Sequence, residues 1–153
     1  MATSWGILNQ QGNLGMPTNK KAVLDTHTFI WFALGIQLDS KIADKIEGFA
    51  RAGHLYISDI TLWEIAMLAK SGKIKLRMTI KAWLEKAVSM PGLHVIPICP
   101  SIAFLSSDLP EFFHGDPADR LIVATAMNLK SVLFTRDSRI LDLAPEYIEC
   151  VEV

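Results

Sequence analysis

The chain has 153 residues, of which 50% are hydrophobic and 20% are charged, a composition that fits one well-filled globular domain and argues against a disordered chain. Its formal net charge of −1 shows no basic excess, so any nucleic-acid site must be local. Charged residues interrupt the most hydrophobic stretches, which argues against a membrane-spanning segment. The two cysteines, Cys99 and Cys150, and an N-terminus without a secretory signal fit a reducing cytoplasm.

The first twenty residues differ from the rest of the chain. Residues 1–20 are rich in Gly, Asn and Gln and lack strand or helix periodicity, so we interpret them as a flexible N-terminal extension. The globular domain is expected over residues 21–153. Because Met16 would itself make a plausible chain start just before the first strand, we expect residues 1–15 to be dispensable for folding.

From Lys21 onward, short apolar strands alternate with helices. In chain order, the pattern predicts a strand at 22–24, a helix around 29–34, a helix capped by Ser40 and stopped by Gly53, a strand at 54–57 and a helix capped by Ser58 or Asp59 that ends at Ser71–Gly72. It then predicts a helix from Thr79 to Pro91, a strand at 94–98, a helix from Pro100, a helix from Asp116–Pro117 to Leu129, a strand at 132–134, a short helix around Ile140 and a strand at 148–153. Continuous apolar strands separated by helices indicate an α/β fold whose parallel sheet is covered on both faces.

Four carboxylates fall at positions that such a sheet brings to one edge. Asp25 directly follows the first strand of the domain, and Asp137 shortly follows the strand at 132–134. Glu64 and Asp119 lie in the early turns of helices that leave the same edge. Because parallel sheets bind ligands at the carboxyl ends of their strands, we expect the four acids to converge there.

A cluster of four carboxylates needs positive charge to balance it. Two unit charges about 4 Å apart repel by roughly 4 kcal/mol at the effective dielectric of a protein surface. An all-oxygen site favours Mg²⁺ or Mn²⁺ over zinc, and such ions would activate water and clamp a phosphodiester. His54, His94 and His114 show no ligand spacing, so zinc has little support, and the cysteines are expected to be packing residues.

Taken singly, each acid also has an ordinary structural explanation. Asp25 can be a turn residue, and Asp137 can cap the helix after it or pair with a neighbouring arginine. Asp116 is the expected N-cap of the helix that follows it, and Asp119 would favour the positive end of that helix. Glu64 is harder to explain, because an acid within an apolar stretch usually needs a partner, although it can also be a solvent-facing helix residue.

Together, four segments resemble the PIN-domain family in their order and local settings. They are LDTH at 24–27, LWEIA at 62–66, DPADRLIVATA at 116–126 and TRD at 135–137. The resemblance runs from about Lys21 to the C-terminus and is most specific at the start of the helix in the third segment. It implies a three-layer α/β/α sandwich with a central, mostly parallel sheet.

The resemblance is closest to the toxins of VapBC toxin–antitoxin pairs, and it implies a metal-dependent endoribonuclease. By carry-over from the family pattern, Asp25, Glu64, Asp119 and Asp137 are the catalytic, metal-holding residues, with Thr135 as a supporting hydroxyl. The implied cofactor is Mg²⁺, with Mn²⁺ as a substitute. The implied partners are RNA as substrate, a second copy in a homodimer, and a small antitoxin protein that reaches into the active site.

His27 departs from the family pattern, since many members have asparagine or serine there. We expect a capped or packed side chain at this position and leave it out of catalysis. The 20-residue leader is a second departure. A chain with an aspartyl-phosphate intermediate would need a second acid where His27 stands, so that rival explanation is weak.

Several basic and aromatic residues leave alternatives open. Arg136 and Arg139 either neutralise carboxylates or hold RNA phosphate, whereas Arg120 is expected to be structural. The basic stretch from Lys70 to Lys81 is either a phosphate track or, as we favour, a solvated face. Three tryptophans are expected in the core or at an interface rather than stacked on bases: Trp31, Trp63 and Trp83.

The main alternative of another class is a catalytically idle RNA-binding or scaffold domain whose acids survive as helix caps. For such a domain, neither EDTA nor the substitution Asp119→Asn would lower RNA cleavage, whereas both would lower it for a metal-dependent enzyme. Divalent-ion binding therefore separates an enzyme from an idle domain.

Overall fold

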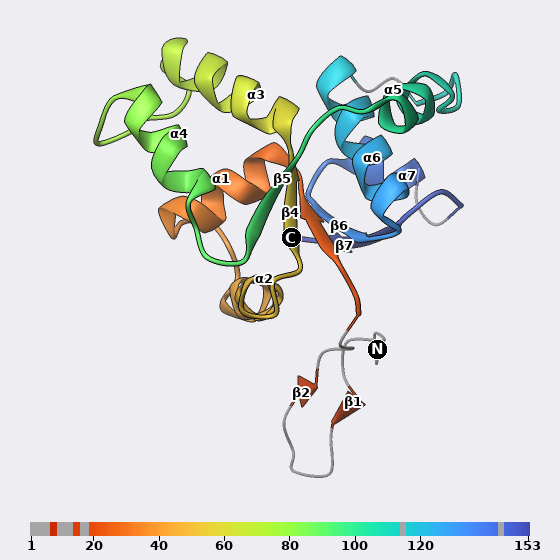
Figure 1. The fold of residues 1–153 in the computed structure, drawn as a ribbon, viewed down its shortest axis with the longest axis horizontal. Coiled ribbons are helices and arrows are strands. Elements are labelled where there is room, and N and C mark those ends of the chain that lie inside the picture. Colours follow the sequence, from red (N-terminus) through yellow and green to blue (C-terminus); the bar gives the residue numbers. More distant parts are fainter. Residues whose placement is uncertain (1–6, 9–13, 16–18, 114–115, 144–145) are drawn as a thin grey trace.

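A five-stranded sheet with only parallel neighbours forms the centre of the protein, in the strand order β5-β4-β3-β6-β7 (Figure 1). A computed structural model describes residues 7–8, 14–15, 19–113, 116–143 and 146–153. The strands of the sheet are β3 (Ala22–Leu24), β4 (Leu55–Ser58), β5 (Leu93–Ile96), β6 (Val132–Thr135) and β7 (Glu149–Glu152). The predicted α/β class and parallel sheet are confirmed.

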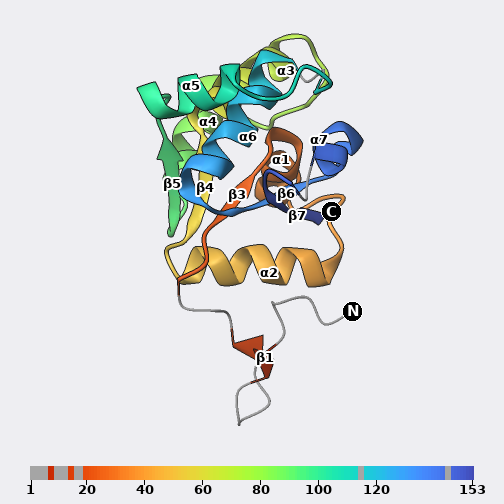
Figure 2. The ribbon, with the colours of Figure 1, turned by 90° about the vertical axis from the view of Figure 1, so that its right-hand side faces the viewer.

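Helices connect the strands and cover both faces of the sheet (Figures 1 and 2). They are α1 (Thr26–Leu34), α2 (Ser40–Arg51), α3 (Asp59–Lys70), α4 (Ile80–Val88), α5 (Pro100–Ser107), α6 (Pro117–Leu129) and α7 (Ser138–Leu143). None of these described helices is both long and apolar enough to cross a membrane.

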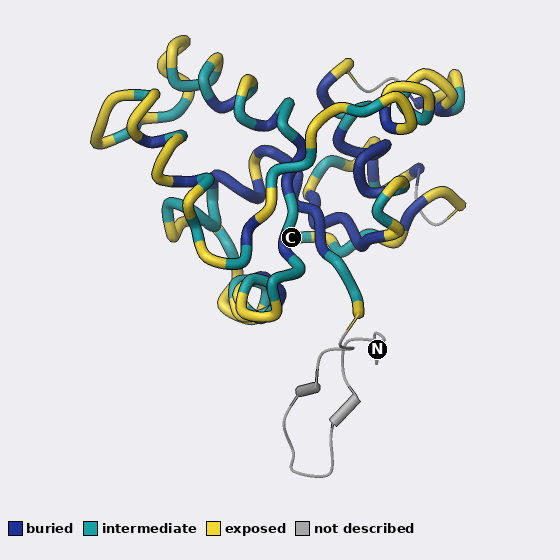
Figure 3. Tube along the Cα trace, in the orientation of Figure 1, coloured by how far each residue is buried: buried dark blue, intermediate teal, exposed yellow. Residues whose placement is uncertain are grey.

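Two separate hydrophobic cores make the fold a three-layer α/β/α sandwich. Successive residues of a strand point to opposite faces, so in β3 Ala22 and Leu24 join one core while Val23 joins the other. The first core lies against α1, α2, α3 and α4, and the second against α6, α7 and the segment after α5. Figure 3 shows the buried segments concentrated in the strands and in the inner faces of the helices.

Side chains at the helix starts explain where several elements begin. Asp25 accepts a hydrogen bond from the Thr28 amide, so α1 begins directly after β3, earlier than the apolar pattern predicts. The predicted cap Ser40 is wrong, because Asp39 caps α2 by accepting from the Lys41 amide. Ser58 caps α3, which settles the choice between two predicted caps.

The N-terminal segment contributes one small antiparallel pair, β1 (Ile7–Leu8) with β2 (Leu14–Gly15). Residues 1–6, 9–13 and 16–18 lie outside the described residues. The expected flexible extension over 1–20 and its dispensability therefore stay predictions.

The two cysteines are unpaired. Cys150 of β7 packs against the second core, and burial, with the charges of Asp25 and Glu149, raises the pKa of its thiol to about 12. A thiol that stays protonated is a poor nucleophile, so Cys150 acts as a packing residue, as predicted.

Candidate active site

The carboxyl ends of β3 and β6 bring Asp25 next to Thr135. The two strands pair in register with Leu24 opposite Phe134, so the next residue of each strand meets its counterpart. The Thr135 hydroxyl donates to Asp25 Oδ2 at 2.5 Å and accepts from the Asp137 amide at 3.0 Å. Asp25 is only 8% exposed. Thr135 thus orients the first acid and ties it to the fourth.

Glu64 reaches the same edge from α3. The Thr26 hydroxyl donates to Glu64 Oε1 at 2.5 Å and lies 3.2 Å from the hydroxyl oxygen of Thr61. Burial raises the pKa of Glu64, and the charges of Asp116 and Asp25 add to that effect; the Thr26 hydrogen bond and nearby His27 oppose it. Glu64 therefore belongs to the acidic cluster and is not a solvent-facing helix residue.

Asp119 and Asp137 are joined by the guanidinium of Arg139. Its Nη2 atom donates to Asp137 Oδ2 at 2.6 Å and to Asp119 Oδ2 at 3.0 Å, and its Nε donates to Asp137 Oδ1 at 3.1 Å. Asp137 also caps α7 by accepting from the Arg139 amide at 2.9 Å. Both structural roles considered for Asp137 are present, and neither removes it from the edge where Asp25, Glu64 and Asp119 also lie, called the acidic edge below.

The charge at this edge is not balanced by Arg139. Burial, then the charges of Asp116 and Asp137, raises the pKa of Asp119 to about 7, although Arg139 acts in the opposite direction. The hydrogen bond from the Arg139 side chain lowers the pKa of Asp137. One guanidinium therefore satisfies Asp137 and leaves the negative charge around Asp119 under-compensated.

Asp116 is a fifth acid at this edge, beyond the four predicted ones. It caps α6 as expected, because its Oδ1 accepts from the Asp119 amide at 2.8 Å. After burial, its charge is also the largest contribution from a neighbouring charge to the raised pKa values of Glu64 and Asp119. The spacing of three residues between Asp116 and Asp119 places both on one helix face, a signal in the sequence that predicts this proximity.

The other two arginines near the acids hold the backbone instead. Arg120 donates to three backbone carbonyls, those of Ser106, Leu109 and Phe113, so the predicted structural role is confirmed. Arg136 donates to the Val153 carbonyl at 2.8 Å, and its guanidinium carbon lies 4.4 Å from the centre of the Trp31 ring.

His27 is exposed at the rim of the cluster, with its ring centre 5.9 Å from that of Trp31. The expected capped or packed histidine is therefore wrong, because the α1 start turns this side chain outward. Trp31 and Trp83 pack in or against the first core, as expected, whereas Trp63 is 58% exposed.

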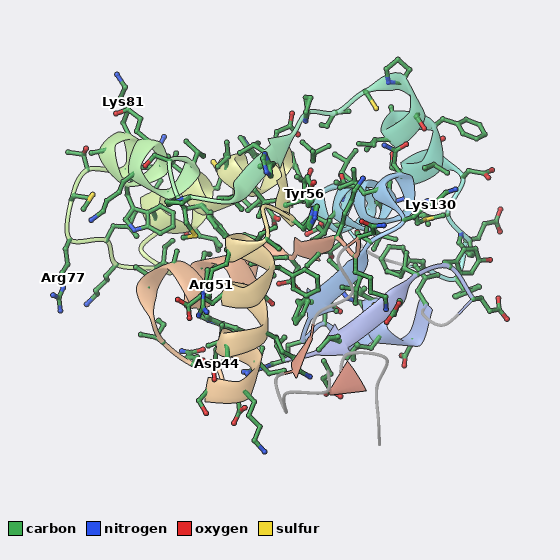
Figure 4. The ribbon with its side chains drawn as sticks, turned by 60° about the horizontal axis from the view of Figure 1, so that its bottom comes forward. Asp44, Arg51, Tyr56, Arg77, Lys81 and Lys130 are labelled. Carbon is green, nitrogen blue, oxygen red and sulfur yellow. The ribbon has the colours of Figure 1, made fainter. Side chains whose placement is uncertain are left out.

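The basic stretch lies away from the acids. Figure 4 shows Arg77 and Lys81 pointing outward from the edge of the molecule. Lys70, Lys73 and Lys75 are exposed as well. This arrangement agrees with the solvated face favoured from the sequence.

The site has the donor chemistry of a hard-cation site. The described residues contain no group of three or more His, Cys, Asp or Glu side chains already gathered as metal ligands. What they do contain is one hydrogen-bonded series of carboxylates, from Asp25 through Thr135 to Asp137 and through Arg139 to Asp119, with Glu64 alongside. Carboxylate oxygens whose charge is only partly balanced fit Mg²⁺ or Mn²⁺.

Comparison with known proteins places the chain in one family. A family model for the PIN domain matches residues 22–145. The chain therefore belongs to the PIN-domain family. Ribonuclease VapC22 of Mycobacterium tuberculosis is 34% identical over 118 residues, which cover 77% of this chain and 88% of that relative.

Solved structures show the same fold at lower sequence identity. VapBC2 from Rickettsia felis, bound to a DNA fragment from its promoter, gives a TM-score of 0.65 at 19% identity and covers 86% of this chain and 97% of its own. DNA-bound VapBC from Salmonella typhimurium gives a TM-score of 0.62 at 19% identity, and the match covers 87% of this chain and 98% of that structure's chain. The three-layer PIN fold expected from the resemblance is confirmed.

Proposed function

We propose that this chain is a divalent-metal-dependent endoribonuclease that acts in the cytoplasm as the toxin of a VapBC-type pair. The observation that carries this proposal is the acidic edge itself, where Asp25, Glu64, Asp119 and Asp137 lie together with more negative charge than Arg139 balances. The relative named a ribonuclease supports RNA as the substrate. The toxin role is supported by the same relative and by the VapBC structures.

The four acids would hold Mg²⁺, or Mn²⁺ in its place, through their carboxylate oxygens. The bound ion would supply an activated water and stabilise charge on the phosphodiester. The chain's own part is to orient these oxygens: Thr135 holds Asp25, and Thr26 holds Glu64. Asp116 fixes the first turn of α6, and with it the backbone of Asp119.

The proposal is tested by cleavage of a panel of RNAs with purified protein in Mg²⁺ or Mn²⁺. We expect EDTA to abolish cleavage and Asp25→Asn to lower its rate by about a hundredfold or more, since the substitution removes a charged ligand. Asp44→Asn is the matched control, because Asp44 lies on α2, below the amino ends of the strands (Figures 1 and 4). Equal activity of Asp25→Asn and the wild type would refute the metal site, and RNA binding without metal-dependent cleavage would favour the idle domain.

Exposed apolar surface supports the two protein partners. Trp63 and Met67, one turn apart on α3, are 58% and 48% exposed and form one small apolar patch. Patches of this kind usually mark interfaces, and we assign this one to the second copy of a homodimer. A separate groove of about 730 Å³ between the end of α1 and α4 is lined mainly by apolar side chains, together with Lys75, Arg77 and Lys86, which suits an antitoxin helix with acidic flanks.

The toxin role is tested by expression in bacteria. We expect the wild type to arrest growth, the small protein encoded next to it to restore growth, and Asp25→Asn to leave growth normal. The purified pair should contain two copies of this chain per complex, as measured by mass. Growth arrest by Asp25→Asn at the wild-type level would show that the arrest does not come from the acidic site.

A further inference from the structure

Arg139 lies at the place where a cation would neutralise both Asp119 and Asp137. One nitrogen, Nη2, bridges the two carboxylates, at 3.0 and 2.6 Å. The two acids come from different elements, α6 and the turn before α7, so this nitrogen is what joins them. A divalent cation held by these carboxylates would repel the guanidinium. The two positive groups therefore compete for one pair of carboxylates.

Of the three arginines near the acids, Arg139 is the one whose side chain can change its hydrogen-bond partners when the acids are neutralised. Arg120 and Arg136 donate to backbone carbonyls, and those hydrogen bonds do not depend on whether the acids are neutralised. The hydrogen bonds of the Arg139 side chain go to the carboxylates themselves, and that side chain is 51% exposed. A cation that takes the carboxylates would release Arg139 and leave the other two arginines in place.

We propose that Arg139 is a positioning residue that exchanges partners, holding Asp119 and Asp137 together without metal and turning to a phosphate oxygen of the RNA once a divalent cation takes those carboxylates. This inference rests on the proposed function, because it requires both the ion and the RNA. The planar guanidinium suits the exchange, since its paired N–H donors match carboxylate and phosphate oxygens equally well. The first turn of α7 keeps the released group beside the acidic edge.

The first test is Mn²⁺ binding to the metal-free protein without RNA. Electron paramagnetic resonance of the free ion measures how much Mn²⁺ is bound. We expect Arg139→Gln to bind Mn²⁺ about tenfold more tightly than the wild type, because the competing charge is gone. Arg139→Lys keeps the charge but loses the paired N–H donors of the guanidinium, so its Mn²⁺ affinity should lie between those of the wild type and Arg139→Gln. Arg51→Gln is the control: Arg51 is exposed on α2, where it pairs with Glu47 (Figure 4). Its Mn²⁺ affinity should equal that of the wild type.

The second readout is RNA cleavage with Mn²⁺ saturating for every variant. We expect both Arg139 variants to lose about tenfold or more in kcat/KM, and Arg51→Gln to match the wild type. Arg139→Gln binding Mn²⁺ no more tightly than the wild type, or cleaving RNA at the wild-type rate, overturns the exchange. A wild type that binds no Mn²⁺, or binds it as well as Asp119→Asn does, overturns the proposed function itself.

Discussion

Asp119→Asn is expected to abolish RNA cleavage and, in the absence of metal at pH 8, to make the protein more stable. The pKa of Asp119 is about 7, against a usual value of 3.8, so the folded protein holds this proton more tightly than the unfolded chain does. The stability linked to that proton is complete below about pH 4 and is lost as the pH rises through 7. Asparagine stays neutral at every pH, so the variant avoids this loss.

Thermal unfolding in EDTA at pH 4 and pH 8 measures the effect. We expect the Tm of Asp119→Asn to exceed that of the wild type by roughly 2–8 °C at pH 8 and to lie close to it at pH 4. The lowered pKa of Asp137 works in the opposite direction, since its stabilisation is lost as the pH falls through a value below 3.8. That window lies below the one used here, so the two acids do not mask each other.

Added Mg²⁺ separates the stability effect from the loss of function. A bound ion stabilises the folded state by mass action, so Mg²⁺ should raise the Tm of the wild type and leave that of Asp119→Asn nearly unchanged. Asp44→Asn, on the exposed face of α2, should behave as the wild type in both media. A variant less stable than the wild type at pH 8 would show that the ion pair with Arg139 outweighs the cost of burying the Asp119 charge and its repulsion from Asp116 and Asp137.

The convergence of the acids could be predicted from the sequence because it depends on the backbone. A carboxylate after an apolar strand of a parallel sheet lies at the carboxyl edge whichever strand is its neighbour, so Asp25 and Asp137 required no knowledge of strand order. To predict that the end of the first strand lies next to the end of the strand at 132–135, the strand order must be known. Asp25 and Thr135 are 110 residues apart, and they meet because β3 pairs with β6.

The side-chain arrangement could not be predicted in the same way. Nothing in the pattern distinguishes Arg139, which bridges two acids, from Arg136, which holds the C-terminal backbone, although both flank Asp137. The outward position of His27 likewise depends on α1 starting directly at Thr26. Such choices depend on rotamers and on distances of a few ångströms, which sequence spacing does not determine.

Gly92→Ala is expected to destabilise the protein strongly without changing any residue of the acidic edge. Gly92 lies between α4 and β5 with a φ of +80°, and a Cβ at this position would lie 1.7 Å from the carbonyl oxygen of Ala50. That oxygen belongs to the backbone of α2, so it cannot turn aside as the end of a flexible side chain can. The loop would have to move away from α2, at a cost of about 4 kcal/mol or more.

Gly72→Ala is the matched control, because Gly72 has nearly the same φ, +76°, but no atom within 4 Å of the added Cβ. The free energy of unfolding of Gly72→Ala should fall only by the cost of a left-handed backbone for alanine, about 1–2 kcal/mol. Urea unfolding of both variants measures the difference, and equal losses would show that the contact with Ala50 relaxes at little cost. Since Gly92 accepts from the Leu55 amide, its displacement also disturbs β4, which leads into the helix carrying Glu64. RNA cleavage should therefore fall with the folded fraction in Gly92→Ala, whereas in Asp119→Asn it is lost from a folded protein.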